Sequence, residues 1–140
     1  MTIKENVVLW NDGRNTLCIV SIPEDQQYGY INDLPCISFG ILYENERFKG
    51  YDTFTLFDCL YADVLKKAQE VICNLNGTFC IRDSGADTDG YMDFKMEKGK
   101  LSVSGQLGAS ISSHSLQFRF LADQTLLQLL IQSLTSDIVP

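Results

Sequence analysis

Apolar and polar residues alternate most regularly in the C-terminal part of the chain. The alternation covers residues 92–96, 101–107 and 115–121, and each run has the period of two that is typical of a strand with one buried face. From Asp123 to Leu134 the apolar positions change to helical spacing. The pattern predicts a meander of three strands followed by a closing helix, with Asp123 as the N-cap of that helix.

The three strands would separate their side chains into two layers, because neighbouring residues of a strand point to opposite faces. The apolar layer, which the helices would cover, contains Met92, Phe94, Met96, Leu101, Val103, Leu107, Leu116, Phe118 and Phe120. The opposite layer, which we expect to be wet or reserved for a partner, contains Asp93, Lys95, Glu97, Ser102, Ser104, Gln106, Ser115, Gln117 and Arg119. Gly105 lies inside the middle strand and predicts either a bulge or the close approach of another backbone.

Two hairpins are predicted in the N-terminal half. The first joins the apolar runs 7–10 and 16–22 through an Asp-Gly turn, which supplies the positive-φ residues of a tight reversal. The second joins 36–43 to 48–56 across a polar turn. Between them, the polar segment from Pro23 to Pro35 predicts a loop that can hold a short edge strand. We place that strand around residues 28–31.

A helix is predicted from Phe57 to Leu75, where apolar residues recur on one face. Thr55 is its expected N-cap, with Asp58 in the position of a capping box, and Asn76-Gly77 is its expected stop. A short strand should follow at residues 78–82, and it leads into an acidic loop that ends at Gly90.

Together these elements predict a single α+β domain over residues 1–140. We expect a strongly twisted antiparallel sheet of about six to eight strands, including the meander, on which the two main helices pack. A chain of 140 residues can remove roughly two-thirds of its unfolded surface from water, so it can build a core without disulfide staples.

Charge and composition narrow the possible partners and the location. The formal net charge is −7, which argues against nucleic acid as a direct partner, because such binding depends on Lys and Arg. The N-terminus lacks the apolar core of a signal peptide, and no apolar run approaches the ~20 residues of a membrane span. We therefore expect a cytoplasmic protein without a membrane partner, and a basic protein as the better match.

The five cysteines are odd in number, widely spaced and without a Cys-x-x-Cys pair. This usage predicts reduced, buried and inert thiols rather than a disulfide framework. The cysteines are Cys18, Cys36, Cys59, Cys73 and Cys80.

Candidates for metal or catalytic chemistry are few. The loop from Asp83 to Asp89 is rich in oxygen ligands, yet it lacks the spacing and the closing Glu of an EF-hand calcium site. His114 is in phase with the apolar residues of the next strand, which predicts a half-buried histidine; a Cys-His hydrolase would need it beside a cysteine and an orienting third group. Histidine and cysteine are too scattered for zinc. We expect no cofactor, no metal and no catalytic residue.

Acidic residues are concentrated in two stretches. The first has no basic residue between Asn15 and Glu46, and it contains Glu24, Asp25, Asp33, Glu44 and Glu46. The second contains Asp83, Asp87, Asp89 and Asp93. Tyr28, Tyr30 and Tyr43 accompany the first stretch as candidate aromatic anchors. These loops either form a surface for a basic partner or are merely solvated.

Three segments carry a resemblance to a known family. They are Gly90-Tyr-Met-Asp-Phe94, Leu101-Ser-Val-Ser-Gly105, and Leu116-Gln-Phe-Arg-Phe120 followed by Asp123-Gln-Thr-Leu-Leu127. This C-terminal part resembles the WapI-like immunity proteins of bacterial polymorphic-toxin systems. The order of elements before it is compatible with the same family.

The resemblance implies a cytoplasmic inhibitor that binds the C-terminal toxin domain of a contact-dependent growth inhibition or Rhs/Wap-type effector. Such a protein is not an enzyme. Toxins of this group are frequently nucleases with basic substrate-binding surfaces, which an acidic inhibitor could recognise and occlude. The candidate toxin-binding residues are Glu24, Asp25, Tyr28, Tyr30, Glu44, Glu46, Asp83, Asp87, Asp89 and Asp93.

Two other functions remain open from the sequence. One is an acidic adaptor or regulatory interaction module that is unrelated to toxin immunity. The other is an enzyme whose activity depends on His114 or on a single cysteine. The oligomeric state is not indicated by any pattern in the chain.

Overall fold

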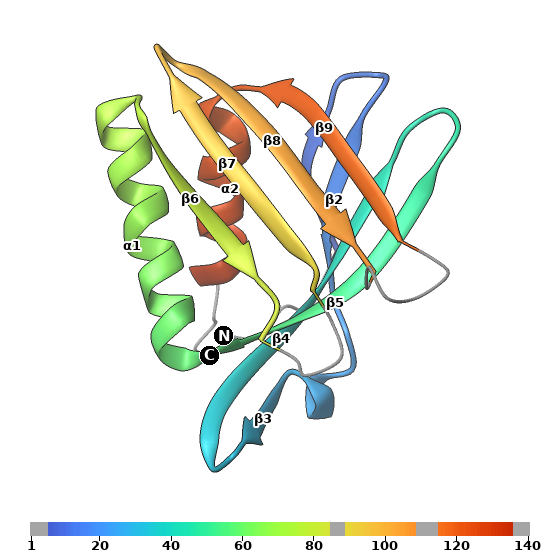
Figure 1. Cartoon of the computed structure of the whole chain (residues 1–140), viewed down its shortest axis with the longest axis vertical. Helices are drawn as coiled ribbons and strands as arrows, with labels where there is room; N and C mark the ends of the chain where they lie inside the picture. The colour runs from blue at the N-terminus through green and yellow to red at the C-terminus, as the bar shows by residue number, and fades with distance from the viewer. Residues whose placement is uncertain (1–5, 85–88, 109–114, 136–140) are drawn as a thin grey trace.

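The computed structural model describes residues 6–84, 89–108 and 115–135. In this part of the chain, nine strands form two antiparallel sheets, and two α-helices and a short 3₁₀ helix complete the fold (Figure 1). The predicted α+β class, with antiparallel strands and two main helices, is confirmed. The strands are divided between two sheets rather than gathered in one, because a helix separates the fifth strand from the sixth and the later strands pair among themselves.

The first sheet, sheet A, is organised around its longest strand. It contains β1 (Val7–Asn11), β2 (Thr16–Val20), β3 (Tyr28–Ile31), β4 (Leu34–Glu44) and β5 (Lys49–Phe57). β4 pairs with β2, β3 and β5, so that every other strand except β1 depends on it for a partner. The edge strand expected near residues 28–31 is confirmed as β3, and the 3₁₀ helix η1 (Glu24–Gln26) leads into it.

The second sheet, sheet B, contains the predicted C-terminal meander. Its strands follow one another in chain order as β6 (Gly77–Arg82), β7 (Tyr91–Glu97), β8 (Lys100–Leu107) and β9 (Leu116–Ala122). The β7–β8 turn has positive φ at Lys98 and Gly99, as a tight reversal requires.

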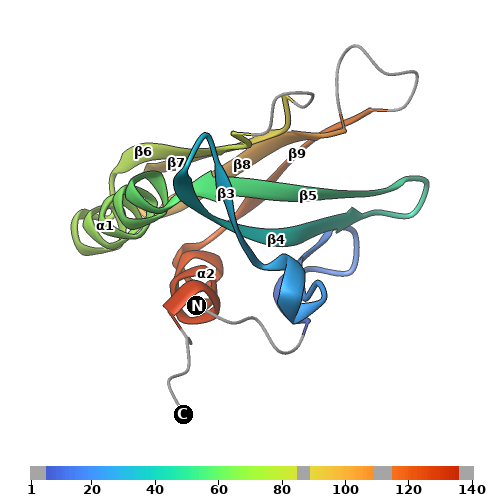
Figure 2. The ribbon, with the colours of Figure 1, turned by 90° about the horizontal axis from the view of Figure 1, so that it is seen from below.

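Both helices lie on the side of the molecule away from the β4–β5 turn (Figures 1 and 2). α1 (Asp58–Asn74) packs beside β6, and α2 (Gln124–Thr135) contacts both α1 and β1. Within the described residues, neither helix has the length and apolar character that crossing a membrane requires.

The core is built from the inner faces of both sheets and from the two helices. Tyr43 of sheet A stacks on Phe118 of sheet B with ring centroids 4.4 Å apart, and Phe79 stacks on Phe94 at 4.6 Å. The predicted apolar layer of the meander is buried, except that Leu116 is only partly buried. Each fully buried large side chain of this kind contributes about 1.5–3 kcal/mol relative to an exposed one.

The ends of α1 differ from the prediction. Thr55 is not the N-cap, because β5 continues to Phe57 and the Thr55 hydroxyl forms a 2.8 Å hydrogen bond with Ser38 of the neighbouring strand. Phe57 occupies the cap position without a side-chain hydrogen bond. At the other end, Leu75 takes the left-handed conformation with φ of 50°, so the helix stops before the expected Asn76-Gly77.

Two local predictions in the C-terminal part are confirmed. Asp123 caps α2, since its Oδ1 accepts a hydrogen bond of 2.9 Å from the backbone N–H of Thr125. Gly105 marks a close approach rather than a bulge, because the β7–β8 register is continuous there. A Cβ at this position would lie 2.7 Å from the Tyr91 carbonyl oxygen and 2.8 Å from Cζ of Phe118.

The prediction of five buried thiols is wrong for three of them. Cys18 and Cys36 are buried, whereas Cys59, Cys73 and Cys80 are exposed. Cys59 and Cys73 lie on α1, and Cys80 points from β6 away from the core, opposite to the buried Phe79 and Ile81. All five are free thiols.

Candidate functional site

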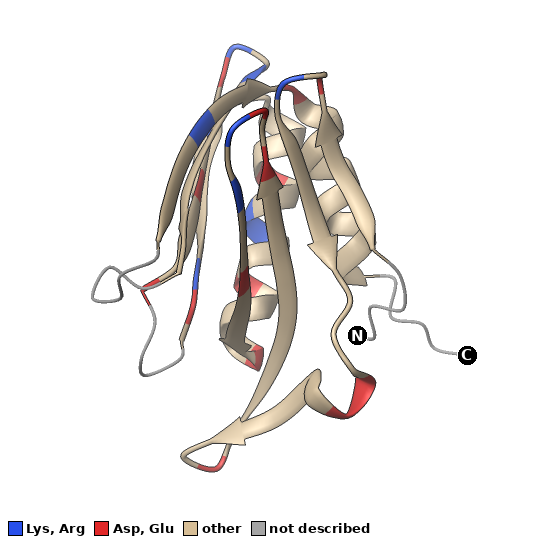
Figure 3. Ribbon diagram, turned by 90° about the vertical axis from the view of Figure 1, so that its right-hand side faces the viewer, with Lys and Arg blue, Asp and Glu red and all other residues tan. Residues whose placement is uncertain are grey.

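A hairpin with exposed side chains projects from one end of sheet A. It comprises η1, β3 and the start of β4, and we call residues 24–36 the arm. Leu34 and Pro35 pair with β3 alone, since the pairing of β4 with β5 begins only at Cys36. The tip of the arm therefore extends beyond the rest of the sheet (Figures 1 and 3).

The turn at the tip is set by two residues. Asn32 and Asp33 have φ of 51° and 67°, and the pairing of Ile31 with Leu34 leaves only these two residues in the loop. Two consecutive positive φ values define a type I′ turn, which matches the twist of the flanking strands and is tolerated best by Gly, Asn and Asp. The sequence therefore holds the arm in one defined hairpin.

Gln27 fixes the base of the arm. This residue is buried, and its side-chain amide donates a hydrogen bond of 3.0 Å to the carbonyl oxygen of Ile22. Its backbone carbonyl accepts a 2.7 Å hydrogen bond from the N–H of Ser38 in β4, and its backbone N–H donates to Glu24. Nothing in the polar pattern of residues 23–35 distinguishes Gln27 from its neighbours, and sequence analysis missed it.

The arm exposes large apolar and aromatic side chains among carboxylates. Tyr30 is 77% exposed, Leu34 is 55% exposed and Tyr28 is 48% exposed. Glu24, Asp25 and Asp33 are exposed as well, and none of the three forms an ion pair within the described residues. Figure 3 shows these acids on η1 and on the turn, without a basic residue on the arm.

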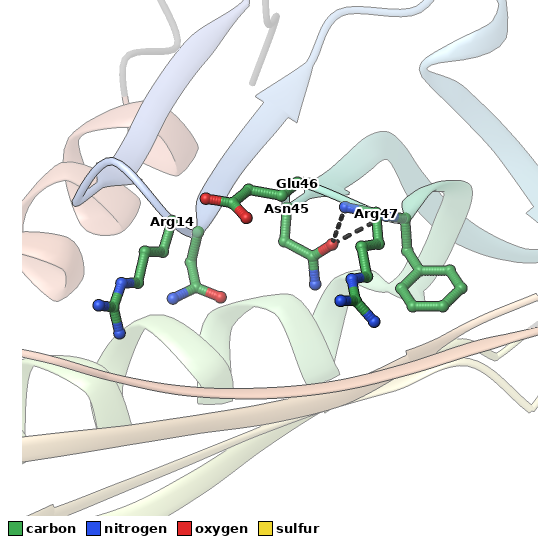
Figure 4. A pocket seen from close by; sticks show the side chains of 6 residues that line it. Arg14, Asn45, Glu46 and Arg47 are labelled. Carbon is green, nitrogen blue, oxygen red and sulfur yellow. Dashed lines mark hydrogen bonds between the residues drawn. The ribbon is translucent and has the colours of Figure 1, made fainter.

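Glu44 and Glu46 do not join this surface. Glu44 is the last residue of β4 and Glu46 follows it in the turn, and the 11 residues of this strand place its two ends roughly 30 Å apart. Glu44 is 3.9 Å from the ammonium of Lys49. Glu46 lines a shallow hollow of about 450 Å³, where Figure 4 shows Arg14 and Arg47 on either side. The first acidic stretch of the sequence is therefore split into an acidic end at the arm and a mixed-charge end.

Tyr43, a candidate anchor in the sequence, is a core residue. It is buried by its stack on Phe118, and its hydroxyl donates a hydrogen bond to the Asn15 side chain. Its inward position follows from the alternation of β4, in which Phe39, Ile41 and Tyr43 share the buried face.

Asp83 of the second acidic stretch has a structural role. Its Oδ1 accepts a hydrogen bond of 3.1 Å from the backbone N–H of Thr55, and its own N–H donates to the carbonyl oxygen of Gly90. The N–H of Ser84 donates to the carbonyl of Thr55. These bonds join the start of the acidic loop to β5, so Asp83 ties sheet B to sheet A. Asp87 lies outside the described residues.

Asp89 and Asp93 also have partners within the protein. Oδ1 of Asp89 accepts a 3.1 Å hydrogen bond from the side-chain amide of Gln106, and Asp93 lies 3.7 Å from the guanidinium of Arg82. Gln106 itself is buried rather than wet as the sequence predicted, because its amide also bonds to Gly108 and to Gln117. The described acids of this stretch thus bind their own chain.

The outer face of sheet B, opposite the core, carries basic as well as acidic side chains. A hollow of about 560 Å³ on this face is lined by three basic residues and one acid, together with serine hydroxyls: Lys67, Lys95, Arg119, Asp93, Ser102 and Ser104. Two of these cations have acidic neighbours on their own elements. Lys67 lies 3.0 Å from Asp63, and the hydrogen bond between them raises the pKa of Lys67. Lys95 lies 3.2 Å from Glu97. The polar outer layer that the sequence predicted for the meander is therefore present at most of its positions, with Gln106 as an exception.

In the ranges 6–84, 89–108 and 115–135, no group of three or more His, Cys, Asp or Glu side chains is placed to hold a metal ion. His114 lies outside the described residues.

Comparisons of the chain with protein-family models, with curated proteins and with solved structures gave no match. The candidate site therefore rests on geometry and charge. Of the ten candidate residues, the structure brings together Glu24, Asp25, Tyr28 and Tyr30 on the arm. Asp33 and Leu34 belong to the same surface.

Proposed function

We propose that this chain is an immunity protein, which binds a cognate bacterial toxin domain in the cytoplasm and neutralises it without chemistry of its own. Inhibition would follow from one-to-one occlusion of the toxin's active site or substrate groove. The observation that carries this proposal is the arm, where exposed tyrosines lie among carboxylates that no basic residue of the arm offsets.

The composition of the arm suits a protein partner with a basic surface. Tyrosine is enriched among the residues that dominate binding energy, because it buries a large area with little loss of conformational freedom. Carboxylates around such anchors attract a basic partner during diffusion and disfavour an acidic one. A toxin that binds nucleic acid presents such a basic groove. The resemblance of the C-terminal meander to WapI-like immunity proteins supports the same choice.

The distribution of charge favours one alternative function. The acidic arm and the lysine- and arginine-bearing outer face of sheet B could contact two different proteins, as an adaptor or regulatory module would. An adaptor would bind two partners at once, whereas an immunity protein needs only the toxin.

The experiment that tests the proposal takes the gene next to the one for this chain and expresses the C-terminal domain of its product as the candidate toxin domain. Growth of cells that express the toxin domain is measured with and without this protein, and the two chains are then co-purified. Rescue of growth together with a stable one-to-one complex is the expected result. Absence of both rescue and complex would overturn the proposal.

Reversal of charge on the arm should weaken this complex. We expect the double substitution Glu24→Lys and Asp25→Lys to reduce affinity roughly tenfold and to flatten its salt dependence, because two attractive contacts become repulsive. Titration calorimetry at low and high salt measures both effects.

The matched control is Glu44→Lys with Glu46→Lys, which makes the same change of charge at the far end of β4. This control should leave affinity nearly unchanged. Equal losses from the two double variants would show that net charge, and not the arm, decides binding.

A further inference from the structure

β3 leaves one edge of the arm open. It pairs with β4 on one side, and no strand in the described part of the chain pairs with its other side. Among the other edge strands, β6 has α1 beside it and β1 contacts α2 (Figure 1), while β5 and β9 each also pair on one side only within the described residues. An open edge is a template for a further strand, and proteins usually cover or blunt it.

The register shows which backbone groups face outward. The backbone carbonyl of Gln27 faces β4, where it accepts the hydrogen bond from the N–H of Ser38. Successive residues of a strand turn their N–H and C=O groups to opposite sides, so Gly29 and Ile31 also face β4. Tyr28 and Tyr30 therefore direct their N–H and C=O groups away from β4.

Pro35 is consistent with this assignment. It lies opposite Tyr30, and proline has no N–H to donate. In an antiparallel pair, residues that do not exchange hydrogen bonds alternate with residues that do, and proline suits the former. The pair of Tyr30 and Pro35 is therefore one that does not exchange hydrogen bonds, and the N–H and C=O groups of Tyr30 point away from β4.

From this geometry we propose that β3 recruits an extended, basic segment of the partner, which joins sheet A as an additional strand. This strand addition rests on the proposed function, and it specifies how the protein would hold the toxin. The outward N–H and C=O groups of Tyr28 and Tyr30 supply the main-chain hydrogen bonds. Their rings, which share one face of β3, contact alternate side chains of the added strand.

Charge decides between such a segment and a second copy of this chain. Antiparallel pairing of two β3 strands would place Asp33 of one copy beside Glu24 and Asp25 of the other, and parallel pairing would place each acid beside its own counterpart. Both arrangements bring like charges together, which costs free energy. A segment with Lys or Arg at its two ends meets acids at both ends of β3 instead.

A proline substitution separates strand pairing from side-chain contact. Tyr30→Val removes the ring and keeps the outward N–H, whereas Tyr30→Pro removes both. The hydrogen bonds between β3 and β4 should survive in both variants, because residue 30 does not donate to β4, and Gly29 tolerates a following proline. We expect Tyr30→Pro to bind the toxin domain roughly tenfold more weakly than Tyr30→Val, because proline removes the outward N–H and therefore one main-chain hydrogen bond to the added strand.

Amide hydrogen exchange gives an independent measurement on the unmodified protein. In the free chain, the N–H groups of Gly29 and Ile31 should exchange slowly and those of Tyr28 and Tyr30 quickly. In the complex with the toxin domain, Tyr28 and Tyr30 should become protected.

The outcomes distinguish the two proposals. A stable complex in which Tyr28 and Tyr30 stay unprotected, or in which the valine and proline variants bind equally, overturns strand addition and leaves the immunity function standing. Failure of the unmodified chain to bind the toxin domain overturns both.

Discussion

At the scale of single residues, Asp12 shows how one carboxylate can hold a turn. Its Oδ1 accepts hydrogen bonds from the backbone N–H groups of Asn15 at 2.7 Å and Arg14 at 2.8 Å, and its Oδ2 accepts one from the Trp10 indole at 3.1 Å. The two backbone bonds are the main reason that the pKa of Asp12 lies far below its ordinary value of 3.8. The charged form is therefore the one that the fold stabilises.

Asp12 should make stability depend on acid. Because its pKa is depressed in the folded state, its contribution is present above pH 3.8 and is lost as the pH falls from there towards the folded pKa. Asp12→Ala should lower the free energy of unfolding by about 1 kcal/mol at neutral pH, since water competes for these exposed bonds. Urea unfolding over a range of pH measures this, and the difference between variant and parent should shrink in acid. A constant difference would contradict the assignment.

A substitution at Gly105 tests how closely this position of β8 packs against the backbone of β7 and the side chain of Phe118. Gly105→Ala would place a methyl group within 3 Å of both the Tyr91 carbonyl oxygen and the Phe118 ring. We expect a loss of about 1–3 kcal/mol, which is typical of overpacking in a core. Gly29→Ala is the control, because a Cβ there meets nothing within 4 Å. Thermal unfolding compares the two, and similar melting temperatures would show that β7 and β8 can separate without cost.

At the scale of elements, the hydrophobic periodicity of the sequence predicted the strands and helices correctly where the pattern lies within a few neighbouring residues. The meander, the two hairpins, both helices and the short β3 all follow from alternation, helical spacing and turn residues within a few positions of one another. Thr55 was misassigned because it pairs with Ser38 of β4, a residue distant in the sequence. This hydrogen bond between strands outweighed the local capping motif. Gln106 was misassigned because its partners come from two other segments.

Asp83 and Ser84, directly after the end of β6, connect sheet B to sheet A through their hydrogen bonds with Thr55 of β5. Asp83→Ala should lower the free energy of unfolding by about 2 kcal/mol, because it removes a charged acceptor from the Thr55 N–H. Asp83→Asn keeps an acceptor oxygen and should cost less. Neither variant should change the affinity for the toxin domain. Weaker binding with unchanged stability, measured by calorimetry and urea unfolding, would return Asp83 to the binding surface.

At the scale of the whole molecule, burial divides the thiols into two classes. Cys59, Cys73 and Cys80 should react rapidly with Ellman's reagent in the folded protein, and Cys18 and Cys36 should react only slowly. Burial, and then the charge of Glu44, raise the pKa of Cys18, which further reduces its thiolate. All five should react at once in urea. Rapid reaction of five thiols without denaturant would mean that the core opens readily.

The candidate site shows why charge counted along a sequence is an incomplete guide. Glu24 and Glu46 belong to one uninterrupted acidic stretch, yet β4 carries them to opposite ends of the molecule. Only the three-dimensional path of that strand separates the arm from the mixed-charge end. The sequence could indicate which residues were candidates, but it could not indicate which of them share a surface.

The placement of the arm also has an evolutionary consequence. Its tip pairs only with itself, and its large side chains face solvent instead of the core. Substitutions there cost little stability, so a lineage can alter them without losing the fold. Recognition can then drift in step with a changing partner through one short contiguous segment, while selection on the two sheets preserves the scaffold.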